Sequence, residues 1–443
     1  MNGTASTINR NILRLAIPNM ISNIVIPLLG MVDVAIAGYI GEDVNIAALS
    51  IGTTIFNFIY WNCAFLRMGT SGITAQAYGA GDFRECANML VRSLWFAFLM
   101  ALLLVVFRKP AGDFSLYVMQ GSDTVQRVAG EYFFVRIWAA PASISLFAVQ
   151  GWFIGMQDAK TPMIVAILSV IMNAAFSLLF VFRFDMGIAG IALGTVVAQY
   201  IGLITSCILW FVKYREYMKY FDIRESLRFE PVVRFLHVNK DIFLRTACVV
   251  AVYTFFTAAS ARFGDTILTT NALLMQLFTL FSYMSDGFAY AGEALSGRFV
   301  GERNPGLLTR YIRRLIFWSL VIAVLYVGVY ALAWREILTI FSPSEEALNM
   351  AGQYIVWIIA VPLAGCIPFI IDGIMIGATK TKLLRNTVFV STLLFFGIFY
   401  ALSPALGNTA LWLSFLVFLF SRGLLLYLYS GKLNANKIIG EGT

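Results

Sequence analysis

The sequence predicts an all-α integral membrane protein with about 12 transmembrane helices, arranged as two six-helix repeat lobes around a central cleft. Three observations carry this prediction. The chain is 60% hydrophobic and only 13% charged. Long apolar stretches recur along its whole length, and one polar linker divides them into halves. These halves share short motifs at a nearly constant offset.

The composition excludes a soluble protein. Ordinary soluble domains carry about 25% charged residues, so a mean hydropathy of +0.80 is incompatible with a surface that faces only water. Each bilayer crossing takes roughly 20 apolar residues and a short connection. About a dozen such helices account for most of the 443 residues, so we expect no separate soluble domain of normal size. A single histidine, His237, leaves little material for a metal site. We therefore expect no cofactor and no bound metal, and the N-terminus shows no signal peptide pattern.

The apolar segments follow one another in two sets of six. In the first half they lie at 13–40, 45–78, 88–107, 129–156, 161–182 and 187–212. In the second half they lie at 242–263, 266–297, 307–334, 347–377, 383–403 and 408–430. Several exceed a minimal span, so tilt or extension into water is expected. The glycine strings GYIG, YGAG and GRFVG are expected to end helices or to let neighbouring helices approach.

One long polar connection separates the two sets. Residues 213–245 carry eight of the Lys and Arg residues, with an amphipathic spacing that suggests a helix lying on the membrane surface. The predicted division is an N-lobe at 1–212, a cytoplasmic linker at 213–245 and a C-lobe at 246–443.

The distribution of basic residues predicts the topology. If the N-terminus and every second loop are cytoplasmic, that side holds 23 Lys and Arg residues and the opposite side holds 6, with three inside helices completing the total of 32. This is a strong positive-inside bias. It predicts a multi-pass protein of the cell membrane with both termini in the cytoplasm. The asymmetry also accounts for the net charge of +8, so no nucleic acid partner is implied.

The two halves resemble each other at an offset of 222 residues. The segments AQAYGAGD (75–82) and GRFVGERN (297–304) align, as do QGWFIGMQDAK (150–160) and DGIMIGATKTK (372–382). The alignment pairs Gly79 with Gly301, Gly151 with Gly373, and Gly155 with Gly377. Because each half has six helices, the copies run in the same direction. Parallel repeats around a central cleft are one way in which secondary transporters are built.

Six segments together resemble a known transporter family. They are PLLGMVDVAIAGYIG (27–41), FLRMGTSGITAQAYGAGD (65–82), GWFIGMQDAKTP (151–162), SDGFAYAGEALSGRFVGERN (285–304), DGIMIGATKTKLLRN (372–386) and ALWLSFLVFLFSRG (410–423). This pattern resembles the multidrug and toxic compound extrusion (MATE) transporters, and more closely their DinF-type branch. The resemblance covers essentially the entire chain. It implies a secondary active transporter without a cofactor.

Asp33 is the first candidate for ion coupling. An ionised carboxylate inside the membrane costs ~2.5–3.5 kcal/mol on insertion scales, and protonation or pairing with a cation removes that cost. Asp33 also matches the family's first-helix acid. Pro27, six residues earlier, cannot donate to the helix and is expected to bend it near Asn23. The alternative is a purely structural ion pair of Asp33 with Arg67 or Arg136.

Three residues of the fifth and sixth predicted helices complete the candidate coupling site. The resemblance implies an Asn-x-x-x-Asp pair followed by a Thr. Asn173 and Thr195 fit this pattern, but Ser177 replaces the second acid. Asn173 and Ser177 still share one helix face and could both line the site. The alternative is that they only form hydrogen bonds that hold neighbouring helices together. Losing a carboxylate weakens a sodium site, whereas a proton needs only Asp33. We therefore expect transported H⁺ to be the coupling ion, with Na⁺ the second choice.

The second half contains three further intramembrane acids. Asp286 and Glu293 lie seven residues apart and hence on one face of the eighth predicted helix. Asp372 lies near the inner end of the tenth. For Glu293 and Asp372 we expect a structural or gating role. Asp286 fits a proton relay and a structural ion pair equally well.

Basic residues supply partners for these acids. Arg298, Lys380 and Lys382 are near enough in sequence to neutralise Glu293 and Asp372. Arg67 is expected to face the cleft or to pair with an acid, because a lipid-exposed guanidinium is costly.

Four functions are considered for these residues. The leading one is a proton-coupled exporter, or antiporter, of amphipathic organic compounds, cations foremost, that works by rocking of the two lobes. A sodium-coupled exporter of the same fold and a flippase for lipid-linked precursors are the alternatives. The flippase would want a cleft rich in Arg or Lys, and the chain offers only Arg67 and Arg136. A membrane-embedded enzyme is disfavoured, because the sequence contains no recognisable catalytic motif. The expected partners are small organic substrates and the lipid bilayer, and the chain is expected to be a monomer.

Overall fold

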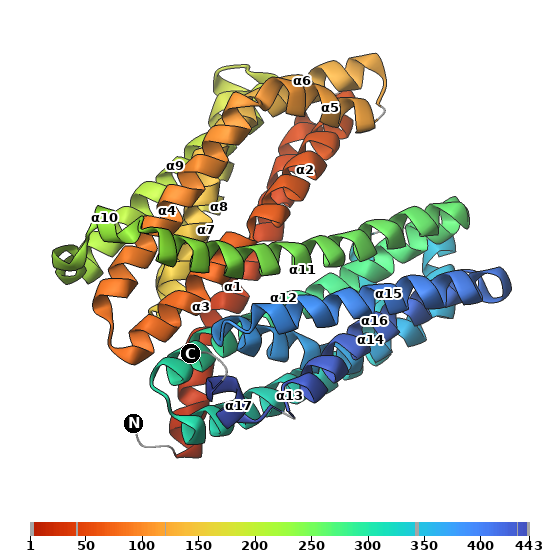
Figure 1. Cartoon of the computed structure of the whole chain (residues 1–443). Coiled ribbons are helices and arrows are strands. Elements are labelled where there is room, and N and C mark those ends of the chain that lie inside the picture. The colour runs from red at the N-terminus through yellow and green to blue at the C-terminus, as the bar shows by residue number, and fades with distance from the viewer. Residues whose placement is uncertain (1–3, 41–42, 120, 342–344, 432, 441–443) are drawn as a thin grey trace. The chain divides into compact units, whose positions relative to one another are not determined.

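Figure 1 shows the computed structural model, which describes residues 4–40, 43–119, 121–341, 345–431 and 433–440. Gly41, the last residue of the segment at 27–41, lies outside this range. The described chain consists of helices and turns and contains no strand. Within it, twelve helical stretches are long and apolar enough to cross a membrane. The predictions of an all-α class and of a dozen spans are confirmed.

The first half of the chain supplies six of these spans. Its elements are α1 (Ala5–Tyr39), α2 (Asp43–Cys63), α3 (Phe65–Ala80), α4 (Phe83–Val106), α5 (Arg108–Met119), α6 (Asp123–Arg136), η1 (Ile137–Ala139), α7 (Ala140–Gly155), α8 (Lys160–Leu178), η2 (Leu179–Arg183) and α9 (Gly187–Tyr214). Helices α2 and α3 together form one span, and α6, η1 and α7 form another. The short helix α5 was not predicted, because its charged residues interrupt the apolar pattern.

The second half supplies the other six spans. The sixth span of the first half ends with η3 (Arg215–Tyr220). The elements that follow are α10 (Ile223–Ser226), α11 (Phe229–Arg262), α12 (Asp265–Gly301), α13 (Pro305–Phe341), α14 (Glu345–Gly377), α15 (Thr381–Leu406), α16 (Asn408–Tyr429) and α17 (Ala435–Gly440). Only a single residue, Gly407, separates α15 from α16. Its φ of 51° lies in the left-handed region that glycine adopts without strain.

The linker at 213–245 is divided among several helices, and its place on the membrane surface stays a prediction. It contains the end of α9, the short helices η3 and α10, and the first part of α11. The Asp222 side chain caps α10 by accepting a hydrogen bond from the Glu225 N–H, at 3.1 Å, so a new helix begins there. Pro231 lies in the first turn of α11, where a missing N–H costs nothing. The rest of the linker therefore joins the seventh span.

Contacts divide the chain into two compact units, which we describe separately. The N-terminal unit contains Ile21–Ala77 and Asp82–Phe235. The C-terminal unit contains Met1–Met20, Tyr78–Gly81 and Leu236–Thr443. The start of α1 thus packs with the second half, as the 2.8 Å hydrogen bond from Asn11 to the Tyr311 hydroxyl illustrates. The predicted lobe limits at 212 and 246 stay a prediction.

The span made of α6, η1 and α7 is the most enclosed one, with 67% of its apolar window buried against about a quarter to a half in the others. It changes from α-helix to 3₁₀-helix directly after Arg136. Pro141 explains the change, because its ring nitrogen cannot donate to the carbonyl of Ile137 four residues earlier. The local sequence therefore fixes Arg136 at a helix end inside the unit.

Each unit contains the same pair of close helix crossings. A Cβ added at Gly151 would lie 2.3 Å from the Arg67 carbonyl oxygen, and one added at Gly373 would lie 2.2 Å from that of Ala289. A second crossing sets Gly155 against Ser71 and Gly377 against Glu293, with corresponding distances of 2.8 and 2.2 Å. All four pairs correspond at the offset of 222 residues. The repeat found in the sequence thus reappears as repeated contacts.

Candidate cation-coupling site

Asp33 lies on α1 in the N-terminal unit and is only 4% exposed. Its Oδ1 atom is buried without a hydrogen-bond partner among the described residues. Two side chains act on the carboxylate, Arg136 through its charge and Asn173 through a hydrogen bond. Burial of a charged carboxylate is costly unless such partners compensate for lost water. Asp33 is therefore an acid whose charge state depends on its neighbours.

Asn173 and Thr195 lie beside each other, as predicted from the sequence. Asn173 on α8 is fully buried, and its Nδ2 donates to the Thr195 Oγ1 on α9, at 2.8 Å. The Thr195 hydroxyl in turn donates to the Ile191 carbonyl one turn earlier, at 3.2 Å. These bonds hold α8 and α9 together and set the Asn173 amide toward Asp33.

Arg136 is the cation of this cluster. It is 8% exposed, and its Nη1 donates to the Tyr132 hydroxyl at 2.8 Å and to Thr195 Oγ1 at 3.0 Å. The guanidinium carbon lies 5.3 Å from the centre of the Phe56 ring and 5.5 Å from that of Tyr132, within range of cation–π attraction. The charge of Arg136 acts on Asp33, whereas an ion pair of Asp33 with Arg67 or Arg136 stays a prediction.

Ser177 and Arg67 are buried on helices of the same unit. The Ser177 Oγ lies 3.5 Å from the Ile191 carbonyl oxygen, and a Cβ at Gly194 would come within 2.3 Å of it. The small serine thus lets α8 and α9 approach closely. Arg67 is 5% exposed on α3, where its backbone carbonyl meets Gly151. The roles predicted for both residues stay predictions.

Pro27 lies within α1, which is helical from Ala5 to Tyr39. The helix is continuous through Pro27 and Asn23, and the predicted bend stays a prediction. Asn23 itself is 8% exposed.

Asp372 of the C-terminal unit has two arginine partners that the sequence did not suggest. The Oδ2 of Asp372, on α14, accepts hydrogen bonds from both Arg245 on α11 and Arg422 on α16. Helix packing thus brings two arginines that are distant in sequence to Asp372, while neutralisation of the acids of this unit by Lys380 or Lys382 stays a prediction. Arg298 instead pairs with Glu302, at 2.7 Å.

The remaining two acids lie on α12. Glu293 is 1% exposed, and its backbone carbonyl meets Gly377. Asp286 is half-buried, and Ser282 on the preceding turn lies 3.5 Å from its Oδ2. The roles predicted for Asp286 and Glu293 stay predictions.

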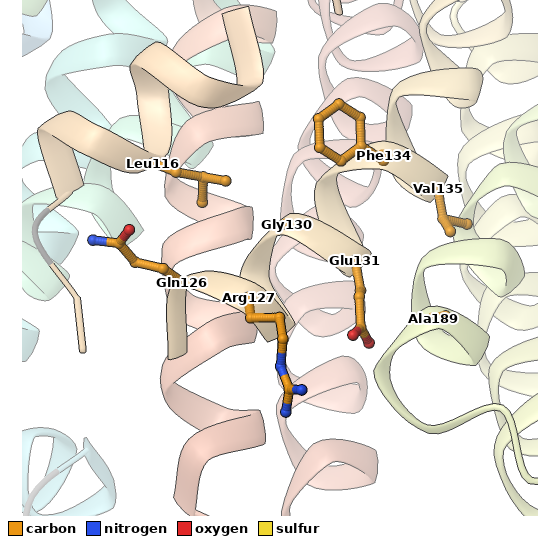
Figure 2. Close-up of a pocket in the computed structure, with 8 residues that line it drawn as sticks. All are labelled: Leu116, Gln126, Arg127, Gly130, Glu131, Phe134, Val135 and Ala189. Carbon is orange, nitrogen blue, oxygen red and sulfur yellow. The ribbon is translucent and has the colours of Figure 1, made fainter. Parts of the chain in front are cut away.

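Figure 2 shows a cavity of about 620 Å³ in the N-terminal unit. Its lining residues come from α5, α6 and α9: Leu116, Gln126, Arg127, Gly130, Glu131, Phe134, Val135 and Ala189. The walls are mainly apolar, and the Arg127 and Glu131 side chains extend from α6 in the same direction. No predicted site residue lines this cavity, so we assign it no part in coupling.

Sequence reasoning missed the aromatic side chains around Arg136. Phe56 and Tyr132 gave no signal among 38 Phe and 19 Tyr residues, because aromatic residues in membrane helices usually face lipid or fill the core. A buried arginine is rarer than a buried aromatic residue. Its guanidinium is stabilised by aromatic faces, so it indicates where such rings lie close by.

The family model described as MatE matches residues 18–179 and again residues 242–401. The chain belongs to the MATE family. It is 35% identical over 414 residues to the DNA damage-inducible protein F of Escherichia coli (strain K12), covering 93% of this chain and 89% of that protein. A probable multidrug resistance protein NorM of Synechocystis is 24% identical over 375 residues, covering 82% of this chain and 79% of that one.

Solved structures agree with the fold. The Vibrio cholerae MATE transporter VcmN in the bent form superposes with a TM-score of 0.84 at 16% identity, covering 99% of this chain and 98% of that chain. The protein is therefore a multi-pass membrane transporter of the multidrug type, of the branch that includes the DNA damage-inducible proteins, and not an enzyme.

Proposed function

We propose that this transporter exports amphipathic organic compounds, cations foremost, in exchange for protons that enter down their gradient. The observation that supports the proposal is the burial of Asp33 beside Asn173 and Arg136 in the N-terminal unit. Asp33 is the group that takes up and releases the transported proton. The lobes are proposed to rock around a central cleft.

Coupling follows from the cost of burying charge. A ligand shifts a conformational equilibrium only if it binds the two states with different affinity. Asp33 meets this condition when one state leaves the carboxylate more exposed to water than the other, because desolvation penalises the charged form. A proton on Asp33 then favours the state that buries it more deeply. The scale is a few kcal/mol, comparable to the ~2.3 kcal/mol for one charge through 100 mV.

The proposed setting is the cell membrane, with both termini in the cytoplasm, and the proposed working form is a monomer without a cofactor. The 23 to 6 distribution of Lys and Arg residues supports this orientation. The half-buried and exposed apolar side chains that cover the helices fit a lipid environment.

Transport by purified protein in lipid vesicles tests the proposal. A proton gradient and a sodium gradient are imposed separately, with a fluorescent organic cation as the substrate. We expect the proton gradient alone to drive accumulation, and Asp33→Asn to abolish it. Robust transport driven by sodium at equal pH on both sides would contradict the proposal and favour the sodium-coupled alternative.

A further inference from the structure

Arg136 has a place in the coupling site that the proposed function does not yet use. It lies at the end of α6 and donates hydrogen bonds to the hydroxyls of Tyr132 and Thr195. The Thr195 hydroxyl also accepts a hydrogen bond from Asn173. Its charge acts on Asp33. A buried guanidinium cannot lose its proton, so this charge is permanent.

The cluster offers few free oxygen atoms to a metal ion. A hydroxyl has one donor and two acceptor positions. Thr195 Oγ1 accepts from both Asn173 and Arg136 and donates to the Ile191 carbonyl, so all three are used. Of the side-chain oxygens of Asp33, Asn173 and Thr195, the buried ones without a hydrogen-bond partner among the described residues are Oδ1 of Asp33 and Oδ1 of Asn173.

A sodium ion and a proton make different demands on such a cluster. A hard metal cation is held by several oxygen ligands, with carboxylates among them. Here one carboxylate is present, Ser177 stands where a second acid is expected from the resemblance, and the positive charge of the Arg136 guanidinium already acts on the first. A proton needs a single oxygen and leaves no separate ion beside the guanidinium.

We propose that Arg136 is the built-in counter-cation of Asp33 and that it makes the site select protons over sodium ions. It does so in two ways. Its charge repels a metal cation from the carboxylate, and its Nη1 occupies the Thr195 oxygen that a metal would need. Arg136 is thus a specificity-determining residue, and the inference rests on the proposed function of Asp33 as the coupling acid.

Sodium binding to the purified protein in detergent tests the inference without any transport assay. Radioactive sodium is titrated against wild type, Arg136→Met and Arg136→Lys. Methionine keeps much of the side-chain length but removes charge and donors, whereas lysine keeps the charge. We expect no site-specific binding by wild type or Arg136→Lys. Arg136→Met is expected to gain sodium affinity on the order of tenfold or more.

A second substitution locates the binding. Asp33→Asn added to Arg136→Met is expected to remove the gained sodium affinity, because it deletes the only carboxylate of the cluster. If folded Arg136→Met gains none, the inference is wrong. If Arg136→Met does not fold, the uncharged Arg136→Gln takes its place and is read in the same way. Sodium binding by wild type that Asp33→Asn abolishes overturns the inference in either case.

The two proposals fail in distinguishable ways. Sodium affinity that appears only without Arg136 supports the counter-cation role even if vesicles show no proton-driven export. Proton-driven export together with sodium binding at Asp33 in wild type would leave the proposed function standing and remove the role of Arg136.

Discussion

At the scale of single residues, Asp33→Asn separates proton binding from every other property of Asp33. Asparagine keeps the size and the hydrogen-bonding capacity, but it cannot gain or lose a proton. We expect the variant to fold and insert, and to lose gradient-driven substrate accumulation down to the level of empty vesicles. Substrate binding is expected to survive, because an amide still offers polar contacts. Fluorescence uptake into vesicles measures the first effect and equilibrium binding the second.

An acid outside the coupling site provides the matched control. Asp113 on α5 is exposed, so Asp113→Asn removes one carboxylate without touching the cluster and is expected to transport as wild type does. If Asp33→Asn pumps substrate at near wild-type rates, Asp33 is structural. The proton carrier must then be sought at Asp286, Glu293 or Asp372.

Asp158, in the turn between α7 and α8, makes stability depend on pH. Burial alone would raise the pKa of this carboxyl, but hydrogen bonds from Thr161 and Lys213 outweigh it and hold the pKa below its ordinary value of 3.8. The bonds measure 2.6 Å to the Thr161 hydroxyl and 3.0 Å to Lys213. A depressed pKa stabilises the folded state above the unfolded pKa, and this contribution is lost as the pH falls through the folded one.

Asp158→Asn is therefore expected to lower the free energy of unfolding by about 1–2 kcal/mol at neutral pH, a modest loss because Lys213 is partly exposed and screened. The difference from wild type is expected to shrink below about pH 4 as the wild-type carboxyl becomes protonated. Thermal unfolding in detergent over a series of pH values measures it. A difference that stays constant down to the lowest pH would contradict the assigned ion pair.

Site residues could be predicted from the sequence where their chemical type is rare in membrane helices. Asp33, Asn173 and Thr195 stood out because polar groups are costly in a membrane, and the last two proved to be hydrogen-bonded to each other. The sequence did not reveal the partners of Asp372 in the C-terminal unit, which are Arg245 and Arg422. Those arginines lie 127 and 50 residues away, and only the packing of α11, α14 and α16 brings them together.

At the scale of helices, the glycine crossings predict where one methyl group matters. Gly373→Ala places a Cβ about 2.2 Å from the Ala289 carbonyl oxygen, so α12 and α14 must separate. We expect a destabilisation of about 1–3 kcal/mol. Gly151→Ala is expected to act similarly between α3 and α7, where the corresponding distance is 2.3 Å. Thermal unfolding of the purified variants measures both.

Gly397 is the matched control for this prediction. It lies within α15 with nothing within 4 Å of an added Cβ. Gly397→Ala is expected to be neutral or to stabilise the helix by up to about 1 kcal/mol. Equal effects at Gly373 and Gly397 would show that propensity rather than close approach governs these positions.

Helix limits were predictable where apolar runs were long and uninterrupted. All twelve spans overlap the predicted segments. The short helix α5 escaped prediction, because RKPAGDFSLYVM mixes charge with apolar residues over only 12 positions. The division of the linker into several helices was not predicted, since amphipathic spacing does not reveal the helix start at the Asp222 cap.

At the scale of the whole molecule, the asymmetry of Lys and Arg residues predicts how the chain inserts. A green fluorescent protein fused to the C-terminus is expected to fluoresce, and alkaline phosphatase fused there to be inactive, because that end is predicted to lie in the cytoplasm. Phosphatase inserted in the turn between α4 and α5, near Phe107, is expected to be active. The reverse pattern would invert the predicted topology.

The fold class could be predicted from the composition and the sequence repeat alone. Both are properties of the whole sequence, and neither depends on knowing which individual residues are in contact. The assignment of residues 4–20 to the C-terminal unit was not accessible. It depends on contacts such as Trp318 with Asn9, at 3.3 Å, between segments more than 300 residues apart in sequence.

The repeated crossings also bear on how a duplicated protein diverges. Each glycine meets a backbone carbonyl of the opposite helix, so the crossing specifies nothing about the side chain of the residue that provides it. Arg67 corresponds to Ala289, and Ser71 corresponds to Glu293, 222 residues apart in both cases. Mutation at these positions leaves the backbone contact intact. One copy of an ancestral half was thus free to gain a buried arginine and the other a buried acid, while both kept the same helix spacing.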